Sequence, residues 1–316
     1  MSNQIKYSPT IDPGSKTHPI VVNNSYPSHL DRQLISPPQK NKTGRHLFCC
    51  LLGALGILFV ILFFVYWFAP QRTTILILGI DHAPSKSYLG RSDTIILTTF
   101  TSLKPYMGML SIPRDLWVNI PGFGENRINT AHFFAETQKP GSGPMVSIDT
   151  IQQNFNIRVN YYVRIRFEGV KDIIDAMGGV NVNLLEPMAG YPAGFHHLTG
   201  NKALAFARDR QGTDDFFRME QGQLLIKAII QQLIKPSSIL IMPKVFLTIY
   251  RSIDSNLPLW HVPRLLMTYL LLGKNGIDNR IISREMATPY ITSQGANVLI
   301  PNWEVISKIT TEMFGQ

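Results

Sequence analysis

Three arginines stand close together in the stretch ALAFARDRQGTDDFFRMEQGQ, which covers residues 203–223. Arg208 and Arg210 end an apolar stretch that we interpret as a strand, and Arg218 follows a polar turn and two phenylalanines. Residues two apart in a strand share one face, so Arg208 and Arg210 would point to the same side. Arginine makes planar, bidentate pairs with phosphate oxygens. The spacing therefore predicts a site that holds an anion.

Three other groups of charged residues stand where we expect strands to begin or end. Asp81 ends the stretch TTILILGID, Arg91 and Asp93 open the next strand, and Arg114 with Asp115 ends YMGMLSIPRD. Ligands of open α/β sheets bind in the crevice at strand ends. We therefore expect these side chains to converge with the three arginines on one site.

The charges at these positions favour phosphate chemistry. Several arginines around one site indicate a pyrophosphate rather than a single carboxylate. Asp81 and Asp93 are hard oxygen ligands, and Mg²⁺ typically takes one or two carboxylates plus substrate phosphates. A metal ion combined with arginines stabilises charge during phosphoryl transfer. We expect Mg²⁺ at Asp81 and Asp93, and Arg114 as the third catalytic residue.

A structural role is the competing interpretation of these charges. For any one of them, an ion pair or a helix cap explains the residue equally well, but for Asp81, Asp93, Arg114 and Arg210 together we favour the site. The sequence contains no P-loop, GxGxxG, His-Glu zinc pattern or GxSxG in this region. It also leaves the general base open between Asp93 and Asp115, because a base is defined by its reach to the attacking hydroxyl.

An uncharged run of 23 residues, LFCCLLGALGILFVILFFVYWFA at 47–69, precedes this region. As a helix it would rise about 34 Å, enough to span a bilayer, and Tyr66 and Trp67 suit the interface at its end. Basic residues precede the run and only Arg72 follows it closely, which predicts a cytoplasmic N-terminus. A cleaved signal peptide is the alternative, but the run is long, starts far from residue 1 and lacks a small-residue cleavage site.

Composition and charge limit the remaining possibilities. Residues 1–46 are rich in Pro, Ser, Asn and Lys, and we expect a disordered cytoplasmic tail there, with 73–316 as one extracytoplasmic domain. The net charge is +9, but residues 1–72 contribute seven Lys/Arg and two Asp/Glu, so nucleic-acid binding gains little support. The only cysteines, Cys49 and Cys50, lie in the apolar run, which excludes a disulfide framework and a Cys-based metal site.

The pattern of elements predicts an α/β/α sandwich with a central mixed sheet. The segments 73–81, 93–100 and 106–115 are apolar at consecutive positions, as in strands covered on both faces. The segment YYVRIRF at 161–167 alternates and places Arg164 and Arg166 on one face. Further expected elements are a strand at 180–184 and helices at 146–155, 168–178, 218–234, within 238–274 and near 302–314. Strands and helices alternate, which is the mark of this fold class.

Taken together, five pieces of the sequence resemble the LytR-CpsA-Psr (LCP) family. They are ILGID, GRSDTIIL, LSIPRDLWVNIPGFGENRINTAH, VNYYVRIRFEGVKDIIDAMGGVNVNL and LTGNKALAFARDR followed by DDFFRMEQGQ, and the resemblance covers roughly residues 74–234. The resemblance implies a membrane-anchored phosphotransferase. Such enzymes move a glycopolymer from a polyprenyl-pyrophosphate carrier to a cell-wall acceptor, commonly peptidoglycan, outside the membrane and with Mg²⁺.

The resemblance also assigns roles to residues. Asp81 and Asp93 match the metal-associated acids of the family, and its pyrophosphate-binding arginines match Arg91, Arg114, Arg208, Arg210 and Arg218. The family usually continues after this cluster with Arg-x-x-Arg-Gln-Gln. Here Gln221 and Gly222 replace the second Arg and the first Gln. Gly222 weakens a helix by about 1 kcal/mol relative to Ala, and one phosphate contact is lost from the family pattern.

Three other functions remain open beside the phosphotransferase. The chain would bind lipid pyrophosphate without turnover, or hydrolyse it with water in place of the acceptor hydroxyl, or regulate transcription, which the expected topology disfavours. A polyprenyl tail would need an apolar slot, and the segments LLIKAIIQQLI at 224–234 and SSILIMPKVFLTIY at 237–250 are candidates to line it. Ordinary core packing is the alternative for both segments.

Overall fold

The computed structural model describes residues 42–68, 72–81, 87–102, 104–209, 215–273 and 276–315. The chain divides into two compact units, Met1–Ile57 and Leu58–Gln316, and the division falls within the first helix, α1 (Lys42–Phe68). This helix begins five residues before the apolar run, inside the expected tail. The rest of that tail, 1–41, lies outside the described residues.

Among the described residues, no single helix is both long and apolar enough to cross a membrane, and the apolar segment Phe48–Phe64 of α1 is shorter than such a span. One bent pair, Phe216–Leu233 with Pro236–Ser252 at 86°, meets the requirement by length and composition together.

The second unit contains most of the elements that the sequence predicts, with short additions. Its strands are β1 (Thr73–Ile80), β2 (Ser92–Thr101), β3 (Tyr106–Ser111), β4 (Trp117–Ile120), β5 (Gly124–Arg127), β6 (Tyr161–Arg166), β7 (Val180–Leu184), β8 (Gly194–Leu198), β9 (Ile253–Ser255), β10 (Ile277–Ile281), β11 (Ala287–Ile291) and β12 (Asn297–Pro301). Its helices are α2 (Thr130–Gln138), α3 (Gly143–Phe155), α4 (Phe167–Ala176), α5 (Gly200–Arg208), α6 (Asp215–Leu233), η1 (Pro236–Ile241), α7 (Met242–Ser252), α8 (His261–Leu272), η2 (Arg284–Met286) and α9 (Trp303–Phe314).

A six-stranded mixed sheet forms the centre of this unit, in the order β10-β3-β2-β1-β6-β9. The pairs β1–β6 and β10–β3 are parallel, whereas β1–β2, β2–β3 and β6–β9 are antiparallel. Almost every residue of β1 is buried, because side chains that alternate along the strand face packed helices on both sides. The prediction of a central mixed sheet is therefore confirmed.

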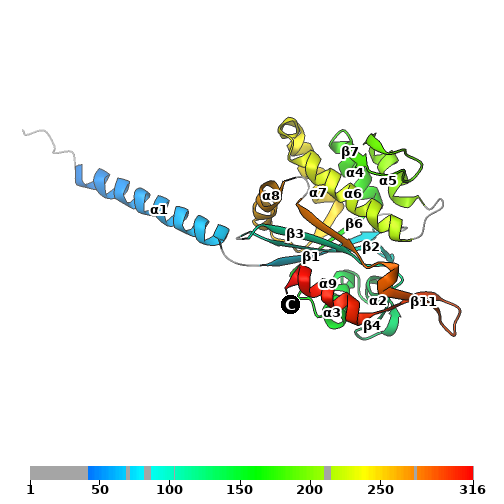
Figure 1. Ribbon diagram of the computed structural model, residues 1–316. Coiled ribbons are helices and arrows are strands. Elements are labelled where there is room, and N and C mark those ends of the chain that lie inside the picture. The colour runs from blue at the N-terminus through cyan, green and yellow to red at the C-terminus, as the bar shows by residue number, and fades with distance from the viewer. Residues whose placement is uncertain are drawn as a thin grey trace, which may run out of the picture. The chain divides into compact units, whose positions relative to one another are not determined.

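Helices cover both faces of the sheet (Figure 1). Leu76 and Leu78 pack on one side with side chains of α2, α3 and α9. Ile75 and Ile96 pack on the other side with Tyr269 of α8 and with apolar residues of α6. A further cluster joins α4, α5, α6 and α7 over the second face. The sheet thus positions its strand ends between two helical layers.

One prediction about local structure is wrong. The stretch ALAFAR is not a strand but lies in α5 (Gly200–Arg208), and its buried residues Gly200, Ala203 and Phe206 recur every three positions, which is helical spacing. The third strand, β3, ends at Ser111, as expected for a strand that Pro113 stops, because proline lacks the N–H that a ladder needs. The strand β9, within residues 238–274, was not predicted, because its three residues are too few to show a strand periodicity.

Candidate functional site

Asp81 and Arg208 form an ion pair at the end of β1. Asp81 is only 4% exposed, and Nη2 of Arg208 donates to its Oδ1. The same guanidinium lies 3.3 Å from the Glu168 carboxylate and over the ring of Phe167, 5.5 Å from its centroid. Arg208 is the last residue of α5, where the partial negative charge of a helix C-terminus favours a cation. The fold therefore delivers Arg208 to the strand end from a helix and not from a strand.

Asp93 and Arg114 form a second pair beside the first. The β1–β2 register pairs Gly79 with Thr94 and Ile80 with Ser92, which leaves Asp93 as the extra residue of a bulge. Nη1 of Arg114, just after β3, donates to Oδ1 of Asp93 at 3.0 Å. A bulge re-aims a side chain, and here it brings the carboxylate of β2 to the chain that leaves β3.

Asp115 extends this second pair toward β5. Its carboxylate lies 3.5 Å from Nε of Arg114 and 3.3 Å from Nη1 of Arg127. Arg127, at the end of β5, was not singled out from the sequence. The only sequence signal for it is its place inside the family-like stretch GFGENRINTAH, because the turn that brings β5 back to Asp115 is a tertiary feature.

Arg218 joins the second pair across a small cavity at the start of α6. Asp93, Thr94, Ser111, Arg114 and Arg218 all line this cavity. The structure therefore brings together charges that the sequence places 125 residues apart, from Asp93 to Arg218. We call the two ion pairs and Arg218 the arginine–carboxylate edge.

The structure does not place two of the predicted site arginines, Arg91 and Arg210, at the arginine–carboxylate edge. Arg91 is exposed just before β2, and the structure does not show it converging with the edge. Arg210 lies outside the described residues, so its role stays a prediction. The argument that Arg208 and Arg210 share a strand face is wrong, because Arg208 belongs to α5.

The two departures from the family pattern lie on α6. Gln221 is 1% exposed, and neither atom of its amide has a hydrogen-bond partner among the described residues. Gly222 lines an apolar cavity, and a Cβ there would meet only Cγ2 of Thr94 at 3.7 Å. The next residue, Gln223, is structural, because its amide donates to Ser111 and to the carbonyl of Arg280.

The apolar cavity has a volume of about 260 Å³ and lies between the sheet and α4–α7. Ile77, Gly79 and Val163 form its sheet side, and Leu225 and Ile249 belong to its helical walls. At Gly79 a Cβ would come within 2.9 Å of Thr94 Cβ, so only glycine leaves this space open. Thr94 lines both this cavity and the small one of the arginine–carboxylate edge. An apolar slot thus adjoins a cationic site.

A wider cleft of about 550 Å³ opens beside Asp115. Phe216, Arg284, Tyr290 and Asn297 also line it, and the Arg284 guanidinium lies over the Phe216 ring at 5.5 Å. Tyr290 is 56% exposed. Aromatic rings beside amide and guanidinium donors are suited to a polar ligand with apolar faces.

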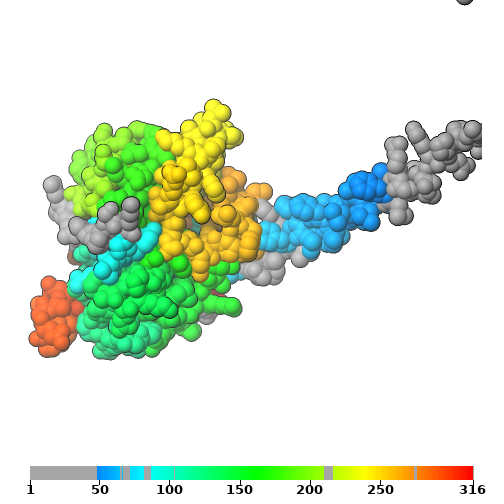
Figure 2. Space-filling model, turned by 180° about the vertical axis from the view of Figure 1, so that it is seen from behind, coloured from blue at the N-terminus to red at the C-terminus, as the bar shows by residue number. Residues whose placement is uncertain are grey.

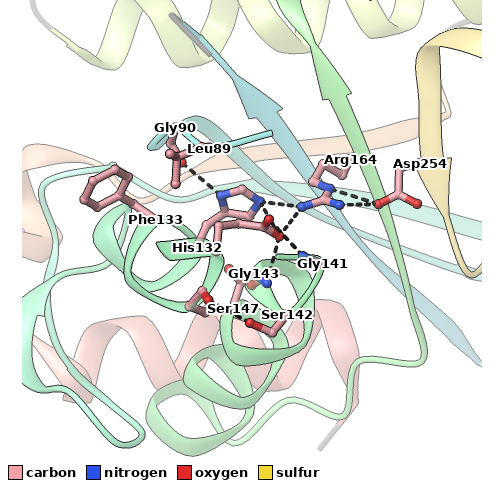
Figure 3. Close-up of polar contacts among 12 residues, drawn as sticks. Leu89, Gly90, His132, Phe133, Gly141, Ser142, Gly143, Ser147, Arg164 and Asp254 are labelled. Atoms are coloured by element: carbon pink, nitrogen blue, oxygen red, sulfur yellow. Dashed lines mark hydrogen bonds and ion pairs between the residues drawn. The ribbon is translucent and has the colours of Figure 1, made fainter. Parts of the chain in front are cut away.

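A buried polar cluster supports the loop before β2 (Figure 3). Nδ1 of His132 lies 2.9 Å from the carbonyl of Gly90, and its Nε2 accepts from Nη1 of Arg164 at 3.1 Å. Arg164 also contacts the Glu136 carboxylate and lies 2.7 Å from that of Asp254. Arg164 and Arg166 both lie over the Tyr88 ring, which confirms that they share a face.

The cluster fixes the protonation state of His132. Arginine is only a donor, so Nε2 must accept and Nδ1 must carry the proton that is donated to Gly90. Burial, together with the charge of the nearby Arg164, lowers the pKa of His132 from 6.5 to about 4, although the Gly90 hydrogen bond opposes this shift. Burial alone would raise the pKa of Glu136, but the N–H of Gly141 and the charge of Arg164 outweigh it and lower the pKa. The imidazole is therefore neutral near pH 7.

Within the part of the chain that the structure describes, no group of three or more His, Cys, Asp or Glu side chains comes together. Asp81 and Asp93 stand at the same end of adjacent strands. Two carboxylates fit a Mg²⁺ ion that takes its other ligands from phosphates and water.

The LytR_cpsA_psr family model matches residues 69–315 of the chain. The polyisoprenyl-teichoic acid–peptidoglycan teichoic acid transferase TagU of Oceanobacillus iheyensis is 32% identical over 251 residues, which cover 78% of this chain and 76% of that protein. TagU of Bacillus cereus is 34% identical over 194 residues, which cover 59% of this chain and 61% of the relative.

Solved structures share the fold. The crystal structure of B. subtilis TagV superposes with a TM-score of 0.63 at 25% identity and covers 78% of this chain and 98% of its own. A structure of TagT bound to LIIa-WTA has a TM-score of 0.61 at 23% identity and covers 78% of this chain and 92% of its own. These structures support the mixed α/β fold with a central mixed sheet.

Proposed function

We infer the function from one premise: the chain belongs to the LytR_cpsA_psr family. We propose that it transfers a glycopolymer from a polyprenyl-pyrophosphate carrier to a cell-wall acceptor such as peptidoglycan. The names of the TagU relatives describe a transfer of this class, from a polyisoprenyl carrier to peptidoglycan. The polymer of this chain belongs to the same chemical class, a glycan joined through phosphate.

The observation that carries the proposal is the order of three features near the end of the sheet at which β1 finishes. The apolar cavity adjoins the arginine–carboxylate edge through Thr94, and the open cleft begins at Asp115. A polyprenyl pyrophosphate has an apolar tail, an anionic head and a glycan in the same order. The tail would enter the cavity, the pyrophosphate would contact Arg114, Arg208 and Arg218, and the acceptor would approach through the cleft.

The reaction replaces the phosphoanhydride bond of the carrier with a phosphodiester bond to the acceptor. The acceptor hydroxyl attacks the phosphorus next to the glycan, a new P–O bond forms, and the bond to the lipid phosphate breaks. The lipid phosphate leaves with the electron pair, and the hydroxyl proton passes to a carboxylate. Asp115 lines the cleft, so it is the candidate base that an acceptor there can reach. The arginines stabilise the charge that spreads over the phosphate oxygens.

A bound Mg²⁺ ion would be held by Asp81 and Asp93 and would supply charge neutralisation at the phosphates. In the structure these carboxylates accept from Arg208 and Arg114, respectively. Each ion pair holds one carboxylate and one guanidinium together at the end of a strand, where the phosphates would bind. Phosphate oxygens that replace a carboxylate as the partner of an arginine would free that carboxylate oxygen.

The proposal includes a membrane anchor. The apolar run 47–69 would cross the membrane with residues 1–46 in the cytoplasm and residues 73–316 outside. The helical, apolar segment Phe48–Phe64 supports this arrangement. An anchored domain would meet a carrier lipid that stays in the same membrane.

The test is turnover by the full-length chain in vesicles that contain a polyprenyl-pyrophosphate-linked oligosaccharide, with a peptidoglycan fragment as acceptor. Mass spectrometry should detect the joined product with Mg²⁺, and Arg114→Ala should abolish it. The matched control is Arg280→Ala, because Arg280 pairs with Asp278 and Glu312 outside the site. Full activity of Arg114→Ala would contradict the proposal. Lipid binding without turnover would favour a non-catalytic lipid-pyrophosphate protein.

A further inference from the structure

Exposed apolar side chains gather on η1, α7 and α8. We call this surface the docking face and define it by Ile239, Leu240, Phe246, Tyr250, Trp260 and Leu271. Leu240 is 91% exposed, Tyr250 77% and Trp260 65%. In Figure 2 the α7 and α8 segments, in yellow and orange, adjoin one another on the surface. Contiguous apolar surface of this kind marks a site of interaction.

The segment that carries the docking face, residues 235–273, has a net positive charge. Residues 235–273 contain a single acidic residue, Asp254, and its carboxylate contacts the buried Arg164. Lys244 and Arg251 of α7 are both exposed. Basic side chains that flank aromatic and aliphatic ones suit an anionic lipid surface, where Trp and Tyr favour the headgroup level.

Helix α8, which carries Leu271 of the docking face, lies at the end of the sheet where β1 begins. Tyr161 pairs with Ile75 in the sheet, and its hydroxyl lies 3.0 Å from Nε2 of His261, the first residue of α8. On the neighbouring strand Phe100 pairs with Thr73, and Ser102 accepts from Nε of Arg264 in α8 at 2.7 Å. Helix α8 therefore covers the beginning of β1, whereas Asp81 stands at its other end.

The proposed anchor places this end of the sheet near the bilayer. The apolar run ends at residue 69, four residues before Thr73, a distance of at most about 14 Å for an extended chain. Asp81 is about 26 Å further along β1. The position of this end near the bilayer rests on the proposed function, because the membrane anchor is part of that proposal.

We propose that the docking face inserts into the outer leaflet of a bilayer that contains anionic phospholipids. The apolar cavity includes Leu233, the last residue of α6 before its connection to α7. Insertion would hold this connection in the leaflet and give a membrane lipid a short apolar path from the acyl region into the cavity. The site at Asp81 would stay above the headgroups.

The test places a reporter on the docking face of the full-length chain. Cys49→Ala and Cys50→Ala remove the native thiols, and Leu240→Cys or Leu271→Cys then carries an environment-sensitive fluorophore. The control is Ile291→Cys on β11, which is similarly exposed at 66% and belongs to the orange-red hairpin on the side of the domain away from α7 and α8 (Figure 2). The vesicles contain phosphatidylcholine and phosphatidylglycerol with a spin-labelled lipid as quencher.

The proposal predicts a blue shift and severalfold stronger lipid quenching at positions 240 and 271 than at 291. Lys244→Glu combined with Arg251→Glu should reduce that quenching severalfold. Equal, water-like emission at all three positions would overturn the proposal. A blue shift without lipid quenching, accompanied by cross-links between Leu240→Cys chains, would also overturn the proposal. That result would identify a second copy of the chain as the partner of the docking face.

A turnover measurement separates this inference from the proposed function. Lys244→Glu with Arg251→Glu should leave turnover of a water-soluble, short-chain polyprenyl pyrophosphate unchanged and should lower turnover of the long-chain carrier in vesicles. Equal loss with both substrates would overturn the docking role. If the unmodified chain turns over neither substrate, the proposed function fails, while quenching still decides whether the face docks.

Discussion

Arg208, the last residue of α5, donates to the buried carboxylate of Asp81 at the end of β1, although 127 residues separate them in the sequence. Each group is suited to a phosphate site, the arginine as a direct ligand and the carboxylate as a metal ligand. Their pairing gives a carboxylate that is 4% exposed a partner of opposite charge. The same contact therefore stabilises the fold and assembles the site.

Removing Arg208 should reduce both stability and transfer. Arg208→Ala leaves Asp81 buried without this partner, and we expect a loss of roughly 2 kcal/mol in the free energy of unfolding. Asp81→Asn combined with Arg208→Ala should recover part of that stability without restoring transfer. Chemical unfolding of the solubilised full chain measures the first effect, with Arg280→Ala as control, for which we expect less than about 1 kcal/mol. Equal losses in the two single variants would contradict a special role for the Asp81 pair.

His132 should make stability depend on pH. Its pKa is about 4 in the folded state and near 6.5 when exposed, so the unfolded chain binds the extra proton between these values. Stability from this group is complete above pH 6.5 and falls as the pH drops toward 4, by up to about 3 kcal/mol. The lowered pKa of Glu136 acts in the same direction at the acidic end.

The matched variant for this prediction is His132→Asn, whose amide can still donate to the Gly90 carbonyl but does not titrate. Unfolding free energies measured between pH 4 and 7 should fall less steeply for the variant than for the unmodified chain. An unchanged slope would assign the pH dependence to other groups.

Much of the architecture could be predicted from residues, and the errors have physical causes. β1 and β2 were recognisable because β-branched and apolar residues fill consecutive positions. The segment of α5 was misread because ALAFAR is short, and only tertiary burial of Ala203 and Phe206 shows its helical period. Asp93 and Arg114 were predicted to share a site, whereas Arg127 was missed because its partner Asp115 is reached through the β4–β5 turn.

Gly222 should control the width of the apolar cavity. Gly222→Ala adds a Cβ that meets only Thr94 at ordinary contact distance, so it should keep lipid binding and stabilise α6 by about 1 kcal/mol. Gly222→Leu extends a side chain into the cavity and should weaken binding of the carrier lipid at least tenfold. Titration of both variants with a fluorescent polyprenyl pyrophosphate measures the difference. Equal affinity of the two variants for the lipid would contradict binding of the lipid tail in the cavity.

Tyr290 should affect the acceptor and not the donor. Its exposed ring lines the cleft beside Asp115, where an acceptor glycan would approach. Tyr290→Ala should raise the KM for the peptidoglycan fragment severalfold and leave the KM for the lipid unchanged, and Tyr290→Phe should retain most of the binding through the ring. Steady-state kinetics with one substrate varied at a time distinguishes these effects. A change confined to the lipid KM would place the donor glycan in the cleft.

The central claim is that the chain joins a glycan to an acceptor hydroxyl and does not merely cleave the lipid pyrophosphate. The most direct measurement runs the reaction of the full-length chain in heavy-oxygen water and weighs every glycan phosphate product by mass spectrometry. Transfer predicts an acceptor-linked phosphodiester without heavy oxygen, lost in Arg114→Ala and kept in Arg280→Ala. A free glycan phosphate that carries heavy oxygen, with no acceptor-linked product, would contradict the claim and identify a hydrolase.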